Sequence, residues 1–238
     1  MTNQMTFKRY ETKYMLTRPQ KAKLISIMKE HMEADCHGRS SILSLYLDTP
    51  DFLLVRRSIE KPLYKEKLRI RSYGVADADG IVFLELKKKF NSVVYKRREE
   101  MSEKQLEQYL ETQVPCKHTQ IMRELDYSMH RYGNPSPSIL ISYEREAFFG
   151  TNDSEFRMTF DENILWRDYD LSLCSPIYGT SLLQPGQILL EVKTANAVPL
   201  WLVHFLSANN IRSVSFSKYG KAYLTKINKT DGGVYTYE

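Results

Sequence analysis

The chain has 238 residues, of which 42% are hydrophobic and 26% are charged, and its formal net charge is +5. This balance is typical of a globular protein with a sizeable core and argues against a disordered chain. The mild excess of positive charge permits an anionic partner without demanding one.

The cysteines and the apolar stretches argue against a secreted or membrane-inserted protein. Cys36, Cys116 and Cys174 are widely spaced and include no CxxC pair, so neither a disulfide framework nor a zinc site is predicted. The longest apolar stretch, PLWLVHFL at 199–206, is far below the roughly 20 residues that span a bilayer. We therefore expect a cytoplasmic protein without direct membrane insertion, which leaves a membrane-protein partner possible.

Eight segments have the alternation and the β-branched or aromatic residues that are typical of strands. Turn residues separate them, as in YGVADADG after the third segment and QPGQ before the eighth. The expected strands, in chain order, are 7–16, 42–48, 63–73, 81–90, 92–101, 138–149, 155–164 and 187–194.

Helical patterns fill the segments between these strands. Thr17 with Gln20, and Ser102 with Gln105, have the spacing of capping boxes. The expected helices are 17–35, 102–111, 119–133, 198–210 and 217–227. No low-complexity linker divides the chain, and GNPSPS at 133–138 is a hinge-like loop, so we predict a single domain over residues 1–238.

Eight meandering strands favour closure, because a closed sheet has no exposed edges. The predicted fold is therefore α+β, an eight-stranded antiparallel β-barrel with helices packed outside. The interior of such a barrel is just wide enough for side chains or one small ligand. What lines that interior would decide the function.

The segment KEKLRIRSYG at 65–74 has an unusual number of cations on one side. At a period of two, Leu68 and Ile70 share one face, and the other face presents Lys65, Lys67, Arg69, Arg71 and Tyr73. A similar alternation of apolar and ionic residues recurs on the expected strands 7–16, 81–90, 155–164 and 187–194.

Two interpretations of these ionic faces remain open. They could be the solvated faces of ordinary antiparallel strands, which alternate apolar and polar residues in the same way. Alternatively, helices cover the apolar side of the sheet and the ionic side is enclosed. Enclosed cations cost several kcal/mol each unless carboxylates or a polyanionic ligand accompany them.

The composition of the ionic faces favours phosphate as the ligand. Arg offers a rigid fork of donors to phosphate oxygens, Lys adds compact charge, and cations outnumber acids. The few acids, Glu11, Glu85 and Glu191, are candidates for holding a divalent cation, which prefers hard oxygen ligands.

Short motifs spread over residues 7–224 together resemble the VTC domain, the catalytic module of vacuolar transporter chaperone polyphosphate polymerases. That family is a branch of the triphosphate tunnel metalloenzymes, also called the CYTH superfamily. Each motif is weak alone, but their order is specific. The motifs are RYETKYML, SLYLDTPDF, KLRIRSYG, FLELKKK, YEREAF, FRMTFDENI, LLEVKT and SFSKYGKAY.

The resemblance implies an antiparallel tunnel that binds ATP or triphosphate and inorganic polyphosphate together with Mn²⁺ or Mg²⁺. It implies Glu191 as the metal ligand, with Glu11 and Glu85 as further acids of the site. It also implies Lys193 and one or two of Lys96, Arg97 and Arg98 at the phosphate site, and of these three we select Lys96 and Arg98. The phosphate ligands that it implies are Lys13, Arg69, Arg71, Lys87, Arg145, Arg157 and Lys218.

Several features depart from the family pattern or leave single residues open. Arg9 stands where the first acid of the superfamily's ExExK signature would be, and Ser215 stands where a Lys can precede FSK. Arg145 could instead form an ion pair with Glu144 or Glu146. No SPX-like sensor or membrane helix is evident, so we expect a lone catalytic module.

The predicted activity is transfer of the γ-phosphate of ATP to polyphosphate, which needs charge neutralisation and positioning more than a general base. The alternatives are a metal-dependent triphosphatase of the same fold and a non-catalytic polyphosphate-binding module. Nucleic acid is not an expected partner, because no aromatic stacking platform accompanies the basic residues.

Overall fold

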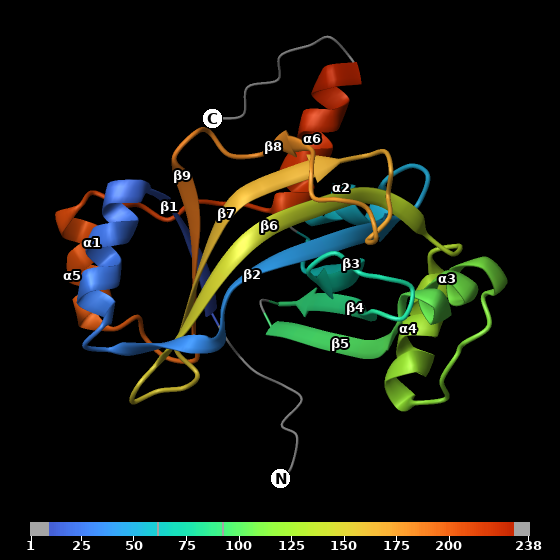
Figure 1. Cartoon of the computed structure of the whole chain (residues 1–238), viewed down its shortest axis with the longest axis horizontal. Helices are drawn as coiled ribbons and strands as arrows, with labels where there is room; N and C mark the ends of the chain where they lie inside the picture. Colours follow the sequence, from blue (N-terminus) through green and yellow to red (C-terminus); the bar gives the residue numbers. More distant parts are fainter. Residues whose placement is uncertain (1–9, 61, 92, 231–238) are drawn as a thin grey trace. The chain divides into compact units, whose positions relative to one another are not determined.

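Groups of strands are separated by one or two helices along the chain in the computed structural model, which describes residues 10–60, 62–91 and 93–230 (Figure 1). The strands are β1 (Tyr10–Thr17), β2 (Met32–Asp48), β3 (Tyr64–Tyr73), β4 (Ile81–Phe90), β5 (Val93–Ser102), β6 (Ser136–Gly150), β7 (Arg157–Arg167), β8 (Thr180–Ser181) and β9 (Gln187–Thr194). The helices are α1 (Arg18–Met28), α2 (Leu53–Ile59), α3 (Glu103–Thr112), α4 (Gln120–Arg131), α5 (Leu200–Ala208) and α6 (Lys218–Thr230).

The strands pair in the order β1-β9-β7-β6-β2-β3-β4-β5, and β8 pairs with β7. The registers of β1 with β9, β7 with β9, β3 with β4 and β4 with β5 are all antiparallel. This order confirms an α+β fold built on an antiparallel sheet. Its two ends are β1 and β5, and within the described residues no pairing joins them, so closure into a barrel is not confirmed.

The expected helix at 17–35 is wrong beyond Met28, because β2 begins at Met32 and runs for 17 residues. The capping box of Thr17 and Gln20 does start α1 as predicted. The expected strand 42–48 is only the second half of β2. The first half contains Gly38 and two serines, which form helices poorly, and pairing within the sheet fixes it as a strand.

Two other differences concern α2 and the loop before β6. No helix was expected at α2, whose first amide groups are capped from a distance: the buried carboxylate of Asp48 accepts from the backbone N–H of Leu54 at 2.8 Å and of Val55 at 3.0 Å. The loop expected at 133–138 is shorter, since β6 already begins at Ser136.

The contacts within the chain divide it into two compact units. The first comprises Met1–Ile42, Tyr143–Ile164 and Leu183–Phe216. The second comprises Leu43–Ser142, Leu165–Leu182 and Ser217–Glu238. Three of the five boundaries fall inside β2, β6 and β7, so these strands contribute residues to both units. A single domain over the whole chain stays a prediction.

The core of the first unit lies between its strands and two helices. Leu24 and Met28 of α1 and Leu202 and Phe205 of α5 pack on alternate residues of the strands. The strand positions in this core are Tyr14, Leu16, Met158, Phe160, Ile188, Leu190 and Val192. The strand residues between them therefore lie on the opposite face of the sheet.

The core of the second unit follows the same rule. Leu106 and Tyr109 of α3 and Met122 and Leu125 of α4 pack on one face of β3 and β4, as the position of these helices in Figure 1 illustrates. The strand positions in this core include Leu68, Ile70, Val82, Leu84 and Leu86. The prediction that helices cover the apolar side of these strands is confirmed. No helix in the described part of the chain is long and apolar enough to cross a membrane.

We expect Leu86→Ala to lower the free energy of unfolding by about 2–5 kcal/mol, because Leu86 is fully buried under α4 and its loss leaves a cavity. Urea denaturation followed by circular dichroism measures the change. The matched control is Leu63→Ala, since Leu63 is 75% exposed and should change the free energy of unfolding little. Equal effects of the two substitutions would contradict the placement of Leu86 in the core of the second unit.

Candidate functional site

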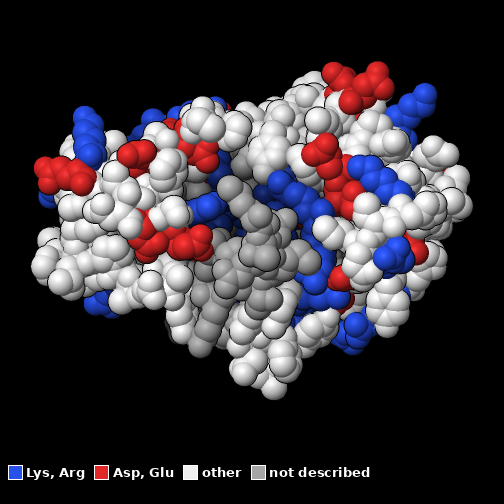
Figure 2. All heavy atoms as spheres, turned by 90° about the horizontal axis from the view of Figure 1, so that it is seen from below, with Lys and Arg blue, Asp and Glu red and all other residues white. Residues whose placement is uncertain are grey.

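The cation-rich face of the second unit is built by three neighbouring strands. The pairing register puts Arg69 of β3 opposite Glu85 of β4, and Glu85 opposite Arg98 of β5. We call this surface the β3–β5 ionic face. Its charged members are Lys65, Lys67, Arg69, Arg71, Glu85, Lys87, Lys89, Lys96, Arg98 and Glu100. Figure 2 shows Lys and Arg side chains gathered in a band at the place of these strands.

Glu85 is the central acid of the β3–β5 ionic face and is only 1% exposed. One carboxylate oxygen accepts from Arg69 Nε at 2.6 Å. The other accepts from Arg98 Nε and lies equally close to Lys96 Nζ, both at 2.6 Å. Glu85 is thus enclosed by three cations from the two neighbouring strands, β3 and β5, and it does not offer the accessible oxygens that a metal ligand needs.

The cations around Glu85 change its acidity and that of Lys96. Burial works to raise the pKa of Glu85, but the charges of Arg69, Arg71 and Lys96 outweigh burial and hold the pKa far below its usual value. Burial lowers the pKa of Lys96 to about 8, although Glu85 partly offsets it. Solvent weakens the influence of burial on the pKa of Lys96, because 42% of this side chain is exposed despite its crowded surroundings.

The sequence left open which of Lys96, Arg97 and Arg98 belongs to the site, and the register shows on which face of the sheet each of them lies. Lys96 lies opposite Lys87, and Arg98 lies over the Phe83 ring at 4.2 Å from its centroid. Arg97 lies on the other face of β5, where its Nε donates to Glu124 of α4 at 2.6 Å. The selection of Lys96 and Arg98 is consistent with this placement.

Two helix ends meet the cations of β3. Lys65 Nζ donates to the carbonyl of Ser58 in α2 at 3.1 Å. Lys67 Nζ donates to the hydroxyl of Ser217 at 3.0 Å, immediately before α6 begins at Lys218. Lys218 itself is 9% exposed. The FSKY motif therefore lies against the β3–β5 ionic face although it is about 150 residues away in sequence.

The first unit has an ionic face of a different kind, built by β1, β9, β7 and β6. The registers put Lys13 opposite Glu191, and Glu191 opposite Thr159. The next row is Glu11, Lys193 and Arg157. We call this surface the β9 ionic face; its charged members are Glu11, Lys13, Arg145, Arg157, Asp161, Glu191 and Lys193. Cations and acids are nearly balanced there.

Lys13 lies between two carboxylates of the β9 ionic face. Its Nζ is 3.4 Å from Glu11 Oε1 and 3.5 Å from Glu191 Oε1, and it donates to the carbonyl of Phe216 at 2.8 Å. Lys193 Nζ lies 4.0 Å from Glu191 Oε2. Two amines, those of Lys13 and Lys193, therefore lie close to Glu191, at a place where positive charge is stabilised.

Arg145 does not pair with Glu144 or Glu146. Its Nε and Nη2 donate to the two oxygens of Asp161 at 2.6 and 2.7 Å, and Nη2 also contacts Glu191 Oε2 at 3.4 Å. Glu144 and Glu146 lie on the other face of β6, where Arg39 and Lys21 contact them. The alternative ion pair is therefore wrong.

Asp161 is the site residue that the sequence reasoning missed. It is completely buried, and the two hydrogen bonds from Arg145 fix that guanidinium beside Glu191. The alternation along β7 could have identified Asp161, because every second residue from Arg157 onward lies on the ionic face and not on the apolar face.

The remaining predicted residues lie on the expected faces. Arg71 is 7% exposed, and Lys87 lies opposite Lys67. Arg157 is exposed, and its Nε donates to the carbonyl of Ser154 at 3.3 Å. Arg9 lies outside the described residues.

Carboxylates of the β9 ionic face fit a divalent cation better than Glu85 does. Glu11 and Glu191 contribute oxygens around one ammonium, and hard oxygen donors suit Mg²⁺ or Mn²⁺. A different group, Asp35, Cys36 and His37 of β2, has ligand atoms within 4.8 Å of one another, but it is largely exposed and none of its residues lies on an ionic face. It does not support the predicted metal site.

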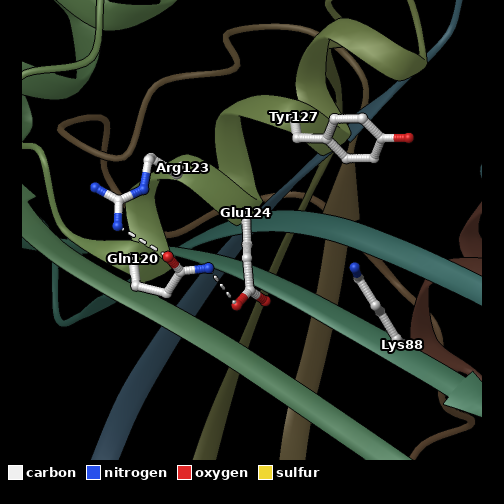
Figure 3. A pocket seen from close by; sticks show the side chains of 5 residues that line it. All are labelled: Lys88, Gln120, Arg123, Glu124 and Tyr127. Carbon is white, nitrogen blue, oxygen red and sulfur yellow. Dashed lines mark hydrogen bonds between the residues drawn. The ribbon is translucent and has the colours of Figure 1, made fainter.

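A pocket of about 310 Å³ lies on the outer side of β4, beside α4 (Figure 3). Lys88, Gln120, Arg123, Glu124 and Tyr127 line it. Arg123 donates to Gln120 and Gln120 donates to Glu124, so its polar groups largely bind one another. None of the predicted site residues lines this pocket.

The model of the VTC domain family matches residues 8–226 of this chain. The chain belongs to the VTC domain family. The resemblance recognised from the eight motifs is thereby confirmed. No protein with a curated description matches the chain.

Two solved structures share the fold of this VTC domain. A candidate adenylate cyclase from Bacillus halodurans is 14% identical with a TM-score of 0.54, and the match covers 90% of this chain and 95% of that one. HpAC1 from Hippeastrum, a candidate adenylyl cyclase described as having a dominant triphosphatase activity, is 15% identical with a TM-score of 0.52. That match covers 94% of this chain and 96% of the other.

The acidity of Lys96 would make the expected binding of an anion to this face dependent on pH. Lys96 is protonated below its pKa of about 8, and a bound anion favours the protonated form. We expect the affinity for tripolyphosphate to fall above that pH, by at most about tenfold per pH unit. Lys96→Arg keeps its charge throughout and should lose this decline.

Calorimetric titrations between about pH 7 and 9.5 measure both proteins. The ratio of their dissociation constants cancels the titration of the ligand itself. A ratio that is independent of pH would contradict the proposed protonation of Lys96.

Glu85→Gln should destabilise the second unit by about 3 kcal/mol at low salt, because it leaves Arg69, Lys96 and Arg98 without their shared carboxylate. This loss of unfolding free energy should have its full size above about pH 4.3, the pKa of Glu in the unfolded chain. It should become smaller only in stronger acid, because the pKa of Glu85 in the folded protein is far lower. Denaturant unfolding at several pH values measures it.

Glu100→Gln is the matched control, because Glu100 is an exposed acid of the same face. Tripolyphosphate should restore stability to the Glu85 variant more than to the wild type, since it supplies the missing negative charge. Equal destabilisation by both substitutions would show that Glu85 has no special role.

Proposed function

We propose that this VTC domain is a polyphosphate polymerase, which transfers the γ-phosphate of ATP to the end of an inorganic polyphosphate chain. The observation that carries the proposal is the composition of the β3–β5 ionic face, where eight cations accompany two carboxylates. A flexible ligand with one negative charge or more per unit would balance this excess. Membership of the VTC family supports polyphosphate as that ligand.

Under this proposal the two ionic faces have different tasks. Arg69, Arg71, Lys87, Lys96 and Arg98 of the second unit would bind phosphate oxygens, together with Lys218 at the start of α6. In the first unit, Lys13, Arg145, Arg157 and Lys193 would bind phosphate beside the acids. Arg145 is already oriented for this by Asp161, so little side-chain entropy would be lost on binding.

A divalent cation, Mn²⁺ or Mg²⁺, would be held by Glu191 with Glu11 and would neutralise charge on the phosphate oxygens when bound. Lys13 contacts both of these carboxylates, so it would have to move or share them. The sequence also suggested Glu85 as a ligand of the cation. Under this proposal, its negative charge would instead reduce the repulsion among Arg69, Lys96 and Arg98.

The proposed reaction is an in-line displacement at phosphorus. An oxygen of the terminal phosphate of polyphosphate forms a bond to the γ-phosphorus, and the bond between that phosphorus and the β,γ-bridging oxygen breaks, which releases ADP. The attacking oxygen is already ionised at neutral pH, so no general base is needed. The chain's residues would supply positioning and electrostatic stabilisation.

A triphosphatase is the second candidate function. It is favoured by the shared fold with HpAC1, whose description names a dominant triphosphatase activity. Such an enzyme would position water instead of a polyphosphate end. A non-catalytic polyphosphate-binding module would have the same ionic faces without turnover.

Product analysis separates these functions. We expect purified protein with ATP and Mn²⁺ to give a polyphosphate ladder on a stained gel, with a short polyphosphate primer shortening any lag. Free phosphate without a ladder would identify a triphosphatase. Neither product, with tripolyphosphate still bound in a calorimeter, would identify a binding module.

Glu191→Gln should lower turnover by at least about 100-fold, because it removes a metal ligand and one negative charge from the reaction site. Binding of tripolyphosphate without metal should be equal or tighter, since one repulsive charge is lost. Glu155→Gln is the control, because Glu155 lies outside the strands of the site. Retained turnover in the Glu191 variant would exclude this residue as the metal ligand.

A further inference from the structure

Two of the sequence motifs, SLYLDTPDF and SFSKYGKAY, have most of their residues outside both ionic faces, yet the structure brings them together in the second unit. Tyr219 of α6 lies at the centre and is 1% exposed. Its hydroxyl donates to Asp48 Oδ2 at 2.7 Å and lies 2.9 Å from Ser138 Oγ. Its ring stacks on Tyr46, with centroids 4.2 Å apart and planes 11° apart.

Asp48 is itself fixed by other contacts. It is 1% exposed, and its two oxygens accept from the first amide groups of α2, at Leu54 and Val55. One carboxylate therefore joins the start of α2 to α6. One turn further along α6, Tyr223 packs against Phe52, with ring centroids 5.2 Å apart.

The hydroxyl of Tyr219 is a permanent donor in this environment. Burial, and then the neighbouring charge of Asp48, raise its pKa well above the usual value for tyrosine. Asp48 Oδ2 consequently always accepts a hydrogen bond from the hydroxyl of Tyr219. A hydrogen bond of this kind, to a charged and buried acceptor, holds its partners in one geometry.

The start of α6 is where this fixed helix meets the ionic face. Ser217 caps it: its hydroxyl accepts from Gly220 N–H at 3.2 Å, and its carbonyl accepts from Lys221 N–H at 2.8 Å. The same hydroxyl accepts from Lys67 of β3 at 3.0 Å. Lys218 stands between Ser217 and Tyr219, so any shift of the Tyr219 anchor would move Lys218.

We propose that Asp48 and Tyr219 are positioning residues, which hold the start of α6 so that Lys218 is presented to the ligand of the β3–β5 ionic face. The inference rests on the proposed function in one respect, the binding of phosphate by Lys218. It assigns a role to Asp48 and Tyr219, which would not touch the ligand and would act by holding α6 in place.

The test is a double-mutant cycle on tripolyphosphate binding, measured by calorimetry. Tyr219→Phe keeps the ring on Tyr46 and removes only the hydroxyl. We expect Lys218→Ala to weaken binding about tenfold and Tyr219→Phe about threefold to fivefold, because a misplaced ammonium keeps part of its attraction. The double variant should bind no more weakly than Lys218→Ala alone.

This non-additivity distinguishes positioning from general support of the fold. If the loss caused by Tyr219→Phe persists in the Lys218→Ala background, or if Tyr219→Phe binds like the wild type, the inference is overturned. Tyr223→Phe is the matched control: it removes a hydroxyl from the same helix, and we expect unchanged affinity. If Tyr219→Phe does not fold, Ser138→Ala removes the other partner of the hydroxyl, and a smaller but equally non-additive loss is expected.

A second readout is independent of phosphate binding. Hydrogen exchange of the amides at 220–222 in the free protein should be faster in Tyr219→Phe and unchanged in Tyr223→Phe, if the hydroxyl fixes the start of α6. Should Lys218→Ala leave tripolyphosphate affinity unchanged, the proposed role of Lys218 fails. Faster exchange would then still support the anchoring of α6, and unchanged exchange would overturn it.

Discussion

The contact of one buried carboxylate with three cations is the interaction on which the β3–β5 ionic face depends. Antiparallel pairing sets Arg69, Glu85 and Arg98 in one row across β3, β4 and β5, and Lys96 lies in the next row of β5. Without the acid, the like charges of Arg69, Lys96 and Arg98 would repel one another. Glu85 lies in the middle of that row and accepts from each. Its charge allows the sheet to form with an excess of cations, which under the proposed function would bind the ligand.

The charges on the two ionic faces are compensated in different ways. In the first unit, acids nearly match cations, and the pairs of Lys13 with Glu191 and of Arg145 with Asp161 leave little net charge. On the β3–β5 ionic face of the second unit, the one buried acid, Glu85, is surrounded and cations predominate. A balanced face suits the exchange of an ammonium for a metal ion, whereas an unbalanced face suits a polyanion.

Much of this arrangement followed from the sequence because strands have a strict period of two. That period alone put Leu68 and Leu86 in the core and Arg69 and Glu85 on the opposite face, and both placements are as predicted. The period could not choose between Arg97 and Arg98, because the segment reads as charged on both faces; the cross-strand register and the position of α4 decide. The period does put Asp161 on the ionic face, but its pairing with Arg145 on another strand could not be inferred from the sequence. α2 was missed because its cap, Asp48, lies outside the usual capping position.

The excess of cations on the β3–β5 ionic face also has a consequence for the solution around it. Fixed positive charges gather small mobile anions from the medium, and a polyphosphate chain that binds there would release them. The release is an entropy gain that shrinks as salt rises, and it grows with the number of phosphates bound. Ionic strength would therefore act as a selector of chain length, favouring long polymers in dilute buffer and reducing that preference in concentrated salt.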